Sequence, residues 1–339
     1  MEDRNLASVV RVLAVGAIPG ADNIEVATVK GWKVVIKRGE FAVGDLAIYY
    51  EIDSFLPVTE RFEFLRARCF RKMAGGREGF RLKTVKLRGQ VSQGLLMPIP
   101  VGHITDGAIE EGVDLTEELG IIKYELPIPA QLSGEAKGLF PNFVPKTDEE
   151  RVQNYNSMGG VNLHGQNVYI TEKLDGSSFT AYIRSGEFGI CSRNLELKPS
   201  EGNAFWQAAV AMDLEVKFRA MGVDIALQGE LIGPGVQGNR YGLKSRAVYF
   251  FTGYYIGEGR RMGVSELVRV LSELRLSMVP IMEWGYVLPS ENLVEVMLGY
   301  AEGKSMLNPI TEREGVVIRG LVENFSFKAI SNRYLLKNE

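Results

Sequence analysis

The chain has 339 residues and a formal net charge of −3, from 39 Lys and Arg against 42 Asp and Glu. Hydrophobic residues make up 45% of it and charged residues 24%, which is ordinary for a folded protein, and the length predicts two domains. Two cysteines and two histidines are too few for a disulfide scaffold or a structural zinc cluster. No apolar run reaches the roughly 18 residues of a membrane span, and the acidic, polar start argues against a signal peptide. We therefore expect a soluble, intracellular protein with no membrane partner.

The first part of the chain alternates short β-branched runs with turns. Strands are expected at residues 8–15, 24–29, 32–36 and 46–51, and the apolar stretch 94–101 would close the sheet. Five short strands in about 100 residues suit a small closed barrel of the OB type. We predict an OB-like domain over residues 1–125.

One segment of this domain is strongly basic. Residues 61–90 contain ten basic residues and two acidic ones, a net charge of +8, so the rest of the chain carries −11. Phenylalanines at positions 62, 64, 70 and 80 lie between these charges. Cations neutralise phosphates and flat rings stack on bases, so the segment is a candidate nucleic-acid surface, with Arg66, Arg68, Arg71 and Lys72 as its candidate contacts. The alternative is a solvated face whose rings point into the core.

A cluster of prolines follows at positions 127, 129, 141 and 145, which predicts an ordered but non-repetitive connector over residues 126–145. Residues 146–339 then alternate strands and helices. Strands are expected at 168–171, 179–184, 225–232, 247–256, 315–319 and 325–330, and helices at 204–220, 264–274 and 291–300. Asn203 is the expected N-cap of the first helix. The second domain is therefore predicted to be α+β.

The sharpest motif is TEKLDGSS at residues 171–178, which places Lys173 after an apolar strand and before a tight Asp-Gly turn. A lysine amine is a nucleophile only when neutral, and burial or nearby positive charge, including that of a metal ion, favours the neutral form. Gly176 would let the backbone approach a ligand closely. Lys-x-Asp-Gly alone is a weak signal, and by itself an exposed hairpin turn would explain it better.

Five further segments follow in order and support this motif. They are Ser192-Arg193-Asn194, QGELIG at 228–233 with Glu230, YFFTGY at 249–254, REGVVI at 313–318 with Glu314, and Ser326-Phe327-Lys328. Each of these residues has a structural alternative, such as a surface carboxylate at a strand end or a core aromatic. The ordered set of six resembles the covalent nucleotidyltransferase superfamily of DNA ligases, RNA ligases and mRNA capping enzymes, and so implies an ATP-grasp-like adenylylation domain.

The resemblance implies roles for individual residues. Lys173 would take AMP from ATP as a phosphoramidate, with Glu172, Asp175 and Gly176 completing the nucleotide-binding motif. Arg193 would contact the ribose or the substrate phosphate, Glu230 the ribose hydroxyls, and Lys328 the α-phosphate. Glu314, and Asp175 with it, would hold a Mg²⁺ or Mn²⁺ ion through water. Phe251 would stack on the purine, with Tyr249 or Phe250 as open alternatives because strand alternation decides which ring faces the pocket.

The order of the two domains indicates which subgroup of the superfamily the chain resembles. Only 11 residues follow Lys328, too few for a barrel, whereas the barrel-like region comes first. This arrangement is similar to a small class of ATP-dependent RNA ligases with an N-terminal OB domain, known from Deinococcus and Naegleria, and the segments GADN at 20–23, GEFAVGD at 39–45 and KTDEER at 146–151 carry the likeness. Arg151 would then help to bind the β- and γ-phosphates. The alternative for Arg151 is a surface cation of a helix over 148–154.

The sequence departs from the pattern at one position. Many ligases carry Lys-x-Lys in the last motif, but position 330 is Ile330, so Lys328 would act alone or Lys337 would reach in. The resemblance implies a monomeric enzyme that uses ATP and a divalent metal to join RNA ends in nicks or breaks during RNA repair, with RNA–DNA hybrids as a further expected substrate. A GTP-dependent RNA guanylyltransferase and a non-catalytic RNA-binding relative are the alternatives.

Overall fold

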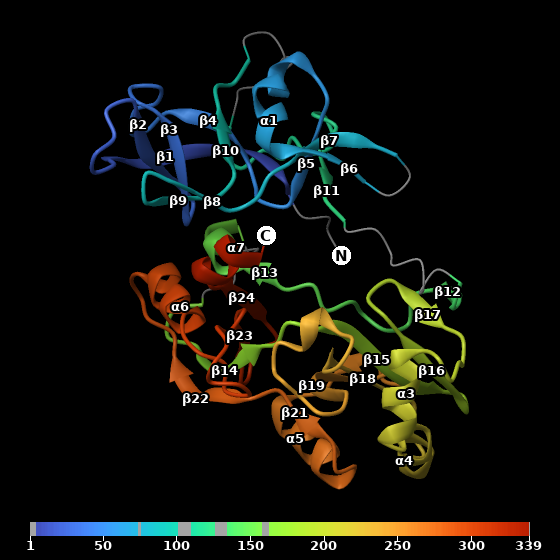
Figure 1. Cartoon of the computed structure of the whole chain (residues 1–339). Coiled ribbons are helices and arrows are strands. Elements are labelled where there is room, and N and C mark those ends of the chain that lie inside the picture. Colours follow the sequence, from blue (N-terminus) through green and yellow to red (C-terminus); the bar gives the residue numbers. More distant parts are fainter. Residues whose placement is uncertain (1–4, 74–75, 101–109, 126–133, 158–162, 339) are drawn as a thin grey trace. The chain divides into compact units, whose positions relative to one another are not determined.

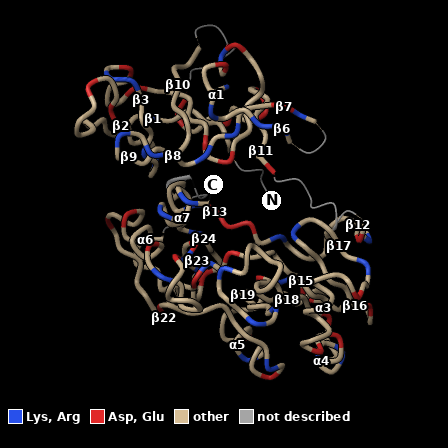
Figure 2. Tube along the Cα trace, viewed as in Figure 1, with Lys and Arg blue, Asp and Glu red and all other residues tan. Residues whose placement is uncertain are grey.

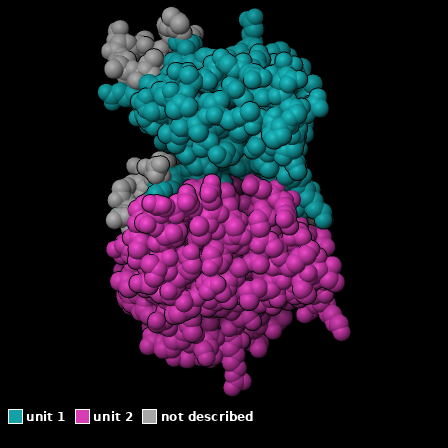
Figure 3. Space-filling view, turned by 90° about the vertical axis from the view of Figure 1, so that its left-hand side faces the viewer, with its two compact units in different colours: residues 1–128, 152–161, 335–339 teal, residues 129–151, 162–334 magenta. Residues whose placement is uncertain are grey.

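The computed structural model describes residues 5–73, 76–100, 110–125, 134–157 and 163–338 (Figure 1). The chain forms two compact units, coloured separately in Figure 3. Unit 1 comprises Met1–Ile128, Val152–Val161 and Leu335–Glu339, and unit 2 comprises Pro129–Arg151 and Asn162–Tyr334. The units therefore interleave along the chain, whereas the predicted boundaries at residues 125 and 146 treat each domain as continuous.

Unit 1 is built on an antiparallel five-stranded sheet in the order β10-β4-β1-β2-β3. Its strands are β1 (Ala7–Ala17), β2 (Ile24–Val29), β3 (Trp32–Lys37), β4 (Leu46–Tyr50) and β10 (Leu95–Met97). Along β3, Trp32, Val34 and Ile36 are buried while Lys33 and Lys37 are exposed, the period of two that a half-buried strand requires. The predicted strands of this region are confirmed, with ends that differ by a few residues; residue 101 of the predicted last strand lies outside the described residues.

The remaining elements of unit 1 are short. A second sheet has the order β11-β5-β7-β6, with β5 (Ser54–Pro57), β6 (Phe70–Lys72), β7 (Glu78–Arg81) and β11 (Ile122–Lys123). The hairpin β8 (Val85–Leu87) and β9 (Gln90–Ser92), the 3₁₀ helix η1 (Glu60–Leu65) and helix α1 (Arg66–Cys69) complete it. The basic segment thus folds as η1, α1 and several short strands.

Unit 2 contains two sheets. The eight-stranded sheet has the order β12-β17-β16-β15-β18-β19-β20, with β21 paired to β19. Its strands are β12 (Ala136–Leu139), β15 (Ser177–Arg184), β16 (Glu187–Cys191), β17 (Leu195–Leu197), β18 (Ile225–Ile232), β19 (Ala247–Tyr255), β20 (Arg260–Arg261) and β21 (Ser277–Met278). The five-stranded sheet has the order β13-β24-β23-β14-β22, from β13 (Glu150–Arg151), β14 (Asn167–Lys173), β22 (Ile281–Val287), β23 (Gly315–Gly320) and β24 (Ser326–Ile330).

Helices cover one face of the eight-stranded sheet, as Figure 1 shows. They are α3 (Ala204–Ala211), α4 (Leu214–Met221) and α5 (Val264–Glu273), and their apolar residues form one core with those of β15, β18 and β19. Helix α6 (Leu293–Ala301), helix α7 (Asn332–Asn338) and the 3₁₀ turns η2 (Val152–Ser157) and η3 (Gln237–Asn239) complete the chain. The predicted α+β class is confirmed. No helix of the described ranges is long and apolar enough to cross a membrane.

Two predictions about elements, and one structural alternative, are wrong. The single helix expected over residues 204–220 is broken into α3 and α4, because Asp213 takes a left-handed conformation with φ of 53°. Its N-cap is confirmed, since the Asn203 side chain accepts hydrogen bonds from the backbone N–H groups of Phe205 and Trp206. Residues 148–154 are not a helix but the strand β13 followed by η2. The connector contains a regular strand, β12, paired with β17; its residues 126–133, with Pro127 and Pro129, lie outside the described residues.

Candidate active site

The predicted nucleophile stands at the end of a central strand. β14 lies between β22 and β23, and its last residue, Lys173, is in register with Gly315 of β23. The Lys173 Nζ atom donates a hydrogen bond to the Oε1 atom of Glu314 at 2.7 Å. Lys173 and Glu314, 141 residues apart in the sequence, are thus brought together by a single strand pairing.

The turn after Lys173 is fixed by its backbone amides. The Asp175 N–H donates to the Tyr241 hydroxyl at 2.7 Å, and the Gly176 N–H donates to Glu230 Oε1 at 3.1 Å. A Cβ atom on Gly176 would lie 2.3 Å from the carbonyl oxygen of Leu231. Glycine is therefore required here because the turn packs against the backbone of β18, a reason that the sequence motif alone did not reveal.

Three carboxylates affect the pKa of the Lys173 amine. Burial lowers the pKa of its amine, but the charges of Glu314, Glu230 and Asp175 together raise it more, so the net direction is upward. The amine is therefore protonated in this arrangement of the site. Burial alone does not produce the neutral nucleophile, and the carboxylate charge has to be offset before Lys173 can attack.

Glu230 has a strongly raised pKa. It lies near the end of β18, opposite Tyr249 of β19, and burial raises the pKa of its carboxyl to about 8, although the Lys173 charge works in the opposite direction. Burial disfavours the charged form of the Glu230 carboxyl, and a nearby cation favours it. The cluster is thus suited to receive positive charge.

The donor set fits a hard divalent cation. Carboxylate oxygens are the protein ligands that Mg²⁺ and Mn²⁺ prefer, and Mg²⁺ keeps several waters when only one or two carboxylates bind it. Within the described residues, no group of three or more His, Cys, Asp or Glu side chains is placed to hold an ion directly. Glu314, Asp175 and Glu230 therefore fit an ion that keeps water or phosphate among its ligands, in line with the predicted water-mediated contact.

Besides Tyr241, sequence reasoning missed two residues that contact Asp175. The Arg240 Nε atom lies 3.3 Å from Asp175 Oδ2, and its guanidinium stands 4.8 Å from the centre of the Tyr334 ring. The Tyr334 hydroxyl also donates a hydrogen bond to Asp175. The available signal was the Gly-x-Arg-Tyr-Gly sequence at 238–242, a glycine-flanked arginine, but only the fold brings it to Asp175.

The side chains of the aromatic strand β19 divide between the helix-covered core and the surroundings of the Lys173 turn. Phe250 is fully buried among helix-facing residues and packs edge-on against Phe179 at 6.2 Å, so it is wrong as a purine-stacking candidate. Phe251 and Tyr249 lie instead against the cluster of Leu174, Ile232 and Tyr241, next to the Lys173 turn. The stacking residue is narrowed to Phe251 or Tyr249, and the choice of Phe251 stays a prediction.

Two predicted phosphate ligands are neighbours in the five-stranded sheet. β13 pairs in parallel with β24 so that Arg151 is in register with Lys328, and Lys328 is in register with Val317 of β23. Val317 faces Thr171 of β14, two residues before Lys173. Residues in register point to the same face, so Arg151, Lys328 and Lys173 share one face of the sheet. Arg151 is 6% exposed in a strand, which excludes the helix-surface alternative.

Other predicted residues lie elsewhere. The Glu172 carboxyl, 1% exposed, accepts a hydrogen bond from the Met306 N–H at 2.7 Å, and burial raises its pKa. It therefore holds the loop after α6. Arg193 is exposed and pairs with Asp148 at 2.6 Å rather than with the Lys173 cluster. Ile330 is buried, and Lys337 is exposed on α7.

Most of the basic residues of the segment 61–90 in unit 1 are exposed. Figure 2 marks the Lys and Arg positions along the chain in blue. Arg66 pairs with Glu63 and its guanidinium lies 4.7 Å from the centre of the Phe70 ring, while Lys72 pairs with Glu78 at 3.2 Å. Arg68 and Arg71 are exposed. Of the four phenylalanines, those at 62 and 80 are buried in the core and that at 64 is 63% exposed. The alternative, in which the rings point into the core, is therefore correct for the rings at 62 and 80. The exposed basic residues remain a candidate nucleic-acid surface.

Comparison with known proteins identifies both parts of the chain. Residues 6–99 match an OB-fold domain, which confirms the predicted fold of the first domain, and residues 166–331 match the RNA ligase family. No curated protein matches the chain.

Solved structures match it over its full length. An RNA ligase of Naegleria gruberi with pyrophosphate is 39% identical, with a TM-score of 0.89 and 99% of each chain covered. Variants of that enzyme with ATP and Mn and with AMP and Mn match equally well, each at 39% identity, a TM-score of 0.89 and 99% coverage of both chains. At this identity and coverage, the chain belongs to the RNA ligase family.

Proposed function

We propose that this chain, an ATP-dependent RNA ligase, joins RNA ends through an AMP adduct on Lys173. The assignment of the nucleophile rests on one observation, the 2.7 Å hydrogen bond between Lys173 Nζ and Glu314 at the end of β14. The carboxylates of Glu230 and Asp175 also act on the charge of this amine. Lys173 supplies the amine of this cluster, and a lysine amine is a covalent nucleophile once it is neutral. The matched Naegleria gruberi enzyme was solved with ATP, AMP and pyrophosphate.

The reaction has three steps. The Lys173 amine attacks the α-phosphorus of ATP, a P–N bond forms, and the bond to the leaving pyrophosphate breaks. The AMP group then passes from Lys173 to the 5′-phosphate of an RNA end. A 3′-hydroxyl attacks that phosphate, AMP leaves, and a phosphodiester remains.

The residues around Lys173 set up the first step. Glu314 orients the amine by accepting its hydrogen bond, and the same carboxylates hold its proton until their charge is offset. A divalent cation, when bound, supplies the positive charge that offsets the carboxylates and the phosphates. Glu314 and Asp175 are the residues that would hold it, through water. Arg240 and Tyr334 contact the Asp175 carboxylate and hold it in place.

The nucleotide would bind along the face of the five-stranded sheet that carries Lys173. Lys328 would contact the α-phosphate, and its sheet neighbour Arg151 would contact the β- and γ-phosphates. Both residues share the sheet face of Lys173, from which they are separated by the pairing of β23 and β24. Glu230 would bind the ribose hydroxyls and Phe251 would stack on adenine. Phosphoryl transfer needs mainly such positioning and charge neutralisation, and no histidine base is required.

RNA is the partner of the chain. We assign its backbone to the exposed basic residues of unit 1, Arg66, Arg68, Arg71 and Lys72. Acceptance of a DNA strand on one side of the break, and action as a monomer, belong to the same proposal.

A nick-sealing assay tests it. A duplex with one RNA nick, carrying a 3′-hydroxyl and a labelled 5′-phosphate, is incubated with protein, ATP and Mg²⁺ or Mn²⁺. We expect a joined strand, with RNA–5′-AMP appearing before it, and no product from a nick that carries a 5′-hydroxyl. Matched duplexes with DNA on either side measure the tolerance for hybrids. Sealing that requires GTP rather than ATP, or no covalent product at all, would contradict the proposal.

A further inference from the structure

Arg319 of β23 contacts two other strands of unit 2 and the residue that precedes a third. Its Nη1 atom donates a hydrogen bond to the Thr171 hydroxyl of β14 at 3.0 Å. Its Nη2 atom lies 3.5 Å from Oε1 of Glu149, the residue directly before β13. Its guanidinium stands 5.4 Å from the centre of the Phe251 ring of β19. One side chain thus contacts both sheets of this unit, and all of these residues belong to it.

The polar contacts of Arg319 are shielded from solvent. The side chains of Arg319 and Glu149 are each 11% exposed, and Thr171 is 1% exposed. Ser326 of β24 is in register with Arg319, and its hydroxyl donates a hydrogen bond to Glu149. Removal of one partner of a buried ion pair leaves the other charge uncompensated, so the paired arrangement is strongly favoured. Glu149 is therefore held against both β23 and β24.

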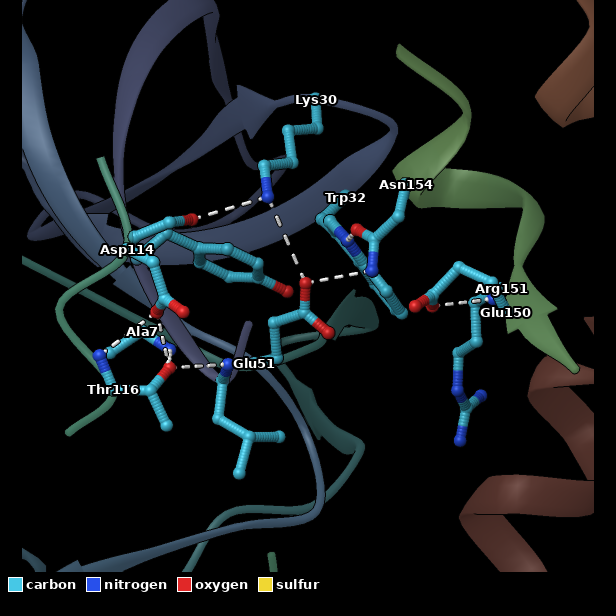
Figure 4. A network of polar contacts seen from close by, with 12 residues as sticks. Ala7, Lys30, Trp32, Glu51, Asp114, Thr116, Glu150, Arg151 and Asn154 are labelled. Carbon is cyan, nitrogen blue, oxygen red and sulfur yellow. Dashed lines mark hydrogen bonds and ion pairs between the residues drawn. The ribbon is translucent and has the colours of Figure 1, made fainter. Parts of the chain in front are cut away.

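The strand that follows Glu149 needs this attachment. β13 consists of Glu150 and Arg151 alone and forms two register pairs with β24, which makes it shorter than an ordinary strand. The backbone N–H of Arg151 donates to the Oε1 atom of Glu150 at 2.7 Å, as Figure 4 shows. The contacts of Glu149 with β23 and β24 add a second attachment close to Arg151. The position of Arg151 in the sheet therefore depends on Arg319 through Glu149.

The contact with Phe251 concerns the other end of the nucleotide. Phe251 is the ring proposed to stack on adenine, and it packs against the cluster that contains Leu174 of the Lys173 turn. A guanidinium is attracted to the face of an aromatic ring, and this attraction restrains the ring. Arg319 is itself bonded to Thr171, in the strand that ends at Lys173. The ring is thereby positioned with respect to the strand of the nucleophile.

We propose that Arg319 is a positioning residue for ATP. It fixes the Phe251 ring for the purine and, through Glu149, the strand that carries Arg151 for the β- and γ-phosphates. The inference rests on the proposed roles of Phe251 and Arg151 in binding ATP. Both ends of the nucleotide would then be positioned by one side chain, which also contacts the strand of Lys173.

The two halves of ATP can be tested separately. Adenosine carries the base without phosphates, and pyrophosphate carries phosphates without a base, so each competes with ATP for its own part of the site. Loss of the Glu149 contact should weaken competition by pyrophosphate, and loss of the stacking ring should weaken competition by adenosine. Loss of the Arg319 guanidinium should weaken both.

The test compares variants of the full chain, each combined with Lys173→Ala so that no adduct forms and binding alone is measured. Equilibrium dialysis of labelled ATP at a fixed concentration of free Mg²⁺, with adenosine or pyrophosphate as competitor, gives the three dissociation constants. Arg319→Met keeps the length of the side chain and removes the guanidinium, and Glu149→Gln removes the charge of its partner. Phe251→Ala and Arg151→Ala report on the contacts on which the inference rests.

Two controls lie outside the contacts of Arg319. Arg260→Met is the matched control, because the Arg260 guanidinium also lies over an aromatic ring, 4.7 Å from the centre of Tyr255, and pairs with Glu266 at 2.8 Å. Thr116→Val removes a hydroxyl of unit 1 that accepts a hydrogen bond from the Ala7 N–H at 3.1 Å (Figure 4). It reports on a general loss of stability.

We expect Arg319→Met to raise the dissociation constant of ATP about tenfold, the effect of leaving one buried charged group unpaired, and to weaken both competitors. Glu149→Gln and Arg151→Ala should weaken pyrophosphate alone, and Phe251→Ala adenosine alone. Glu149→Gln should add nothing for pyrophosphate in the Arg319→Met background. Both controls should stay within about twofold of the Lys173→Ala chain for all three ligands.

Unchanged competition by either probe in Arg319→Met, or an effect of Arg260→Met or Thr116→Val as large as that of Arg319→Met, would overturn the inference. Additive effects of Glu149→Gln and Arg319→Met on pyrophosphate would also overturn it. Unchanged pyrophosphate competition in Arg151→Ala, or unchanged adenosine competition in Phe251→Ala, would instead remove the ATP contact on which the inference rests.

Discussion

The two units use their charges in different ways. In unit 2 the charged groups of the site pair in the interior: the Lys173 and Glu314 side chains are 28% and 14% exposed, and those of Arg240 and Asp175 are 17% and 15% exposed. In the basic segment of unit 1 the pairs are open to solvent, with Lys72 and Glu78 at 62% and 50%.

This difference separates two kinds of contribution. A charge that loses its partner in a buried site is left uncompensated, so each residue there matters individually. Exposed charges are screened by salt and contribute little one by one, but together they attract a polyanion. We therefore expect single substitutions to disable the site in unit 2, whereas the basic segment of unit 1 should lose affinity gradually and in a salt-dependent way.

The largest effect is expected from Lys173→Ala. It removes the atom that accepts AMP, so the rate of ATP-dependent sealing should fall at least about 10³-fold, the scale found when a covalent nucleophile is deleted. Lys304→Ala, which removes an exposed lysine of the same unit, should stay within about twofold of wild type. Gel assays of nick sealing measure both. Comparable losses of nick sealing in the two variants would contradict the expected difference between the buried site residues and the exposed charged residues.

The next effect belongs to the last motif. Lys328→Ala removes one of the cations proposed to meet the triphosphate, and we expect a loss of about 10²-fold in sealing. Lys337→Ala should have little effect, because that side chain is exposed on α7 and Lys328 would act without a second lysine. Comparison of the two variants shows whether Lys328 acts alone or Lys337 takes the place of the second lysine of Lys-x-Lys. A large loss in Lys337→Ala with little in Lys328→Ala would reverse the assignment.

A smaller effect concerns pH and stability. The carboxyl of Glu230 has a pKa of about 8 in the folded chain against 4.5 as its ordinary value, so the folded state binds more protons between these pH values. Stability should therefore fall as pH rises from 4.5 through 8. Glu230→Gln cannot titrate, and its melting temperature should fall less over this window than that of wild type.

Thermal unfolding followed by circular dichroism without nucleotide or metal measures this slope. Glu201→Gln, which removes an exposed carboxyl from the same unit, is the matched control and should follow wild type. If Glu230→Gln shows the wild-type slope, the carboxyl of Glu230 is not the group that links pH to stability.

The smallest single-site effects are expected in unit 1. Arg68→Glu or Arg71→Glu should reduce RNA joining only a fewfold at low salt and less at high salt, while adenylylation of Lys173 without RNA stays at the wild-type level. Reversal of both should give a larger loss. Joining rates across a salt series test this. An equal loss of adenylylation would mean that the segment supports folding rather than RNA binding.

Much of the site follows from the sequence because its residues lie in strands or directly beside them. Lys173, Glu230, Glu314 and Lys328 each come directly before or after, or within, an apolar run, and strand pairing brings such positions together. The order of the motifs then defines the family. The OB-fold strands were predictable for a similar reason, because turn residues separate β-branched runs.

What the sequence did not reveal depends on tertiary neighbours. Arg240 and Tyr334 meet Asp175 only in the fold, and the upward pKa of Lys173 results from carboxylates far apart in the chain. The break at Asp213 is a single backbone conformation within an otherwise helical pattern. The place of Asn154 in unit 1 depends on its bonds to Trp32 and Glu51, more than 100 residues earlier.

The central claim is that Lys173 carries AMP. The direct measurement is to incubate the wild-type chain with ATP and Mg²⁺ or Mn²⁺ in the absence of RNA, digest it, and locate the AMP group by mass spectrometry. We predict one adduct, on the peptide that contains Lys173, released again as AMP when a nicked RNA is added. An adduct on a different residue, or the same adduct yield in Lys173→Ala, would contradict the account.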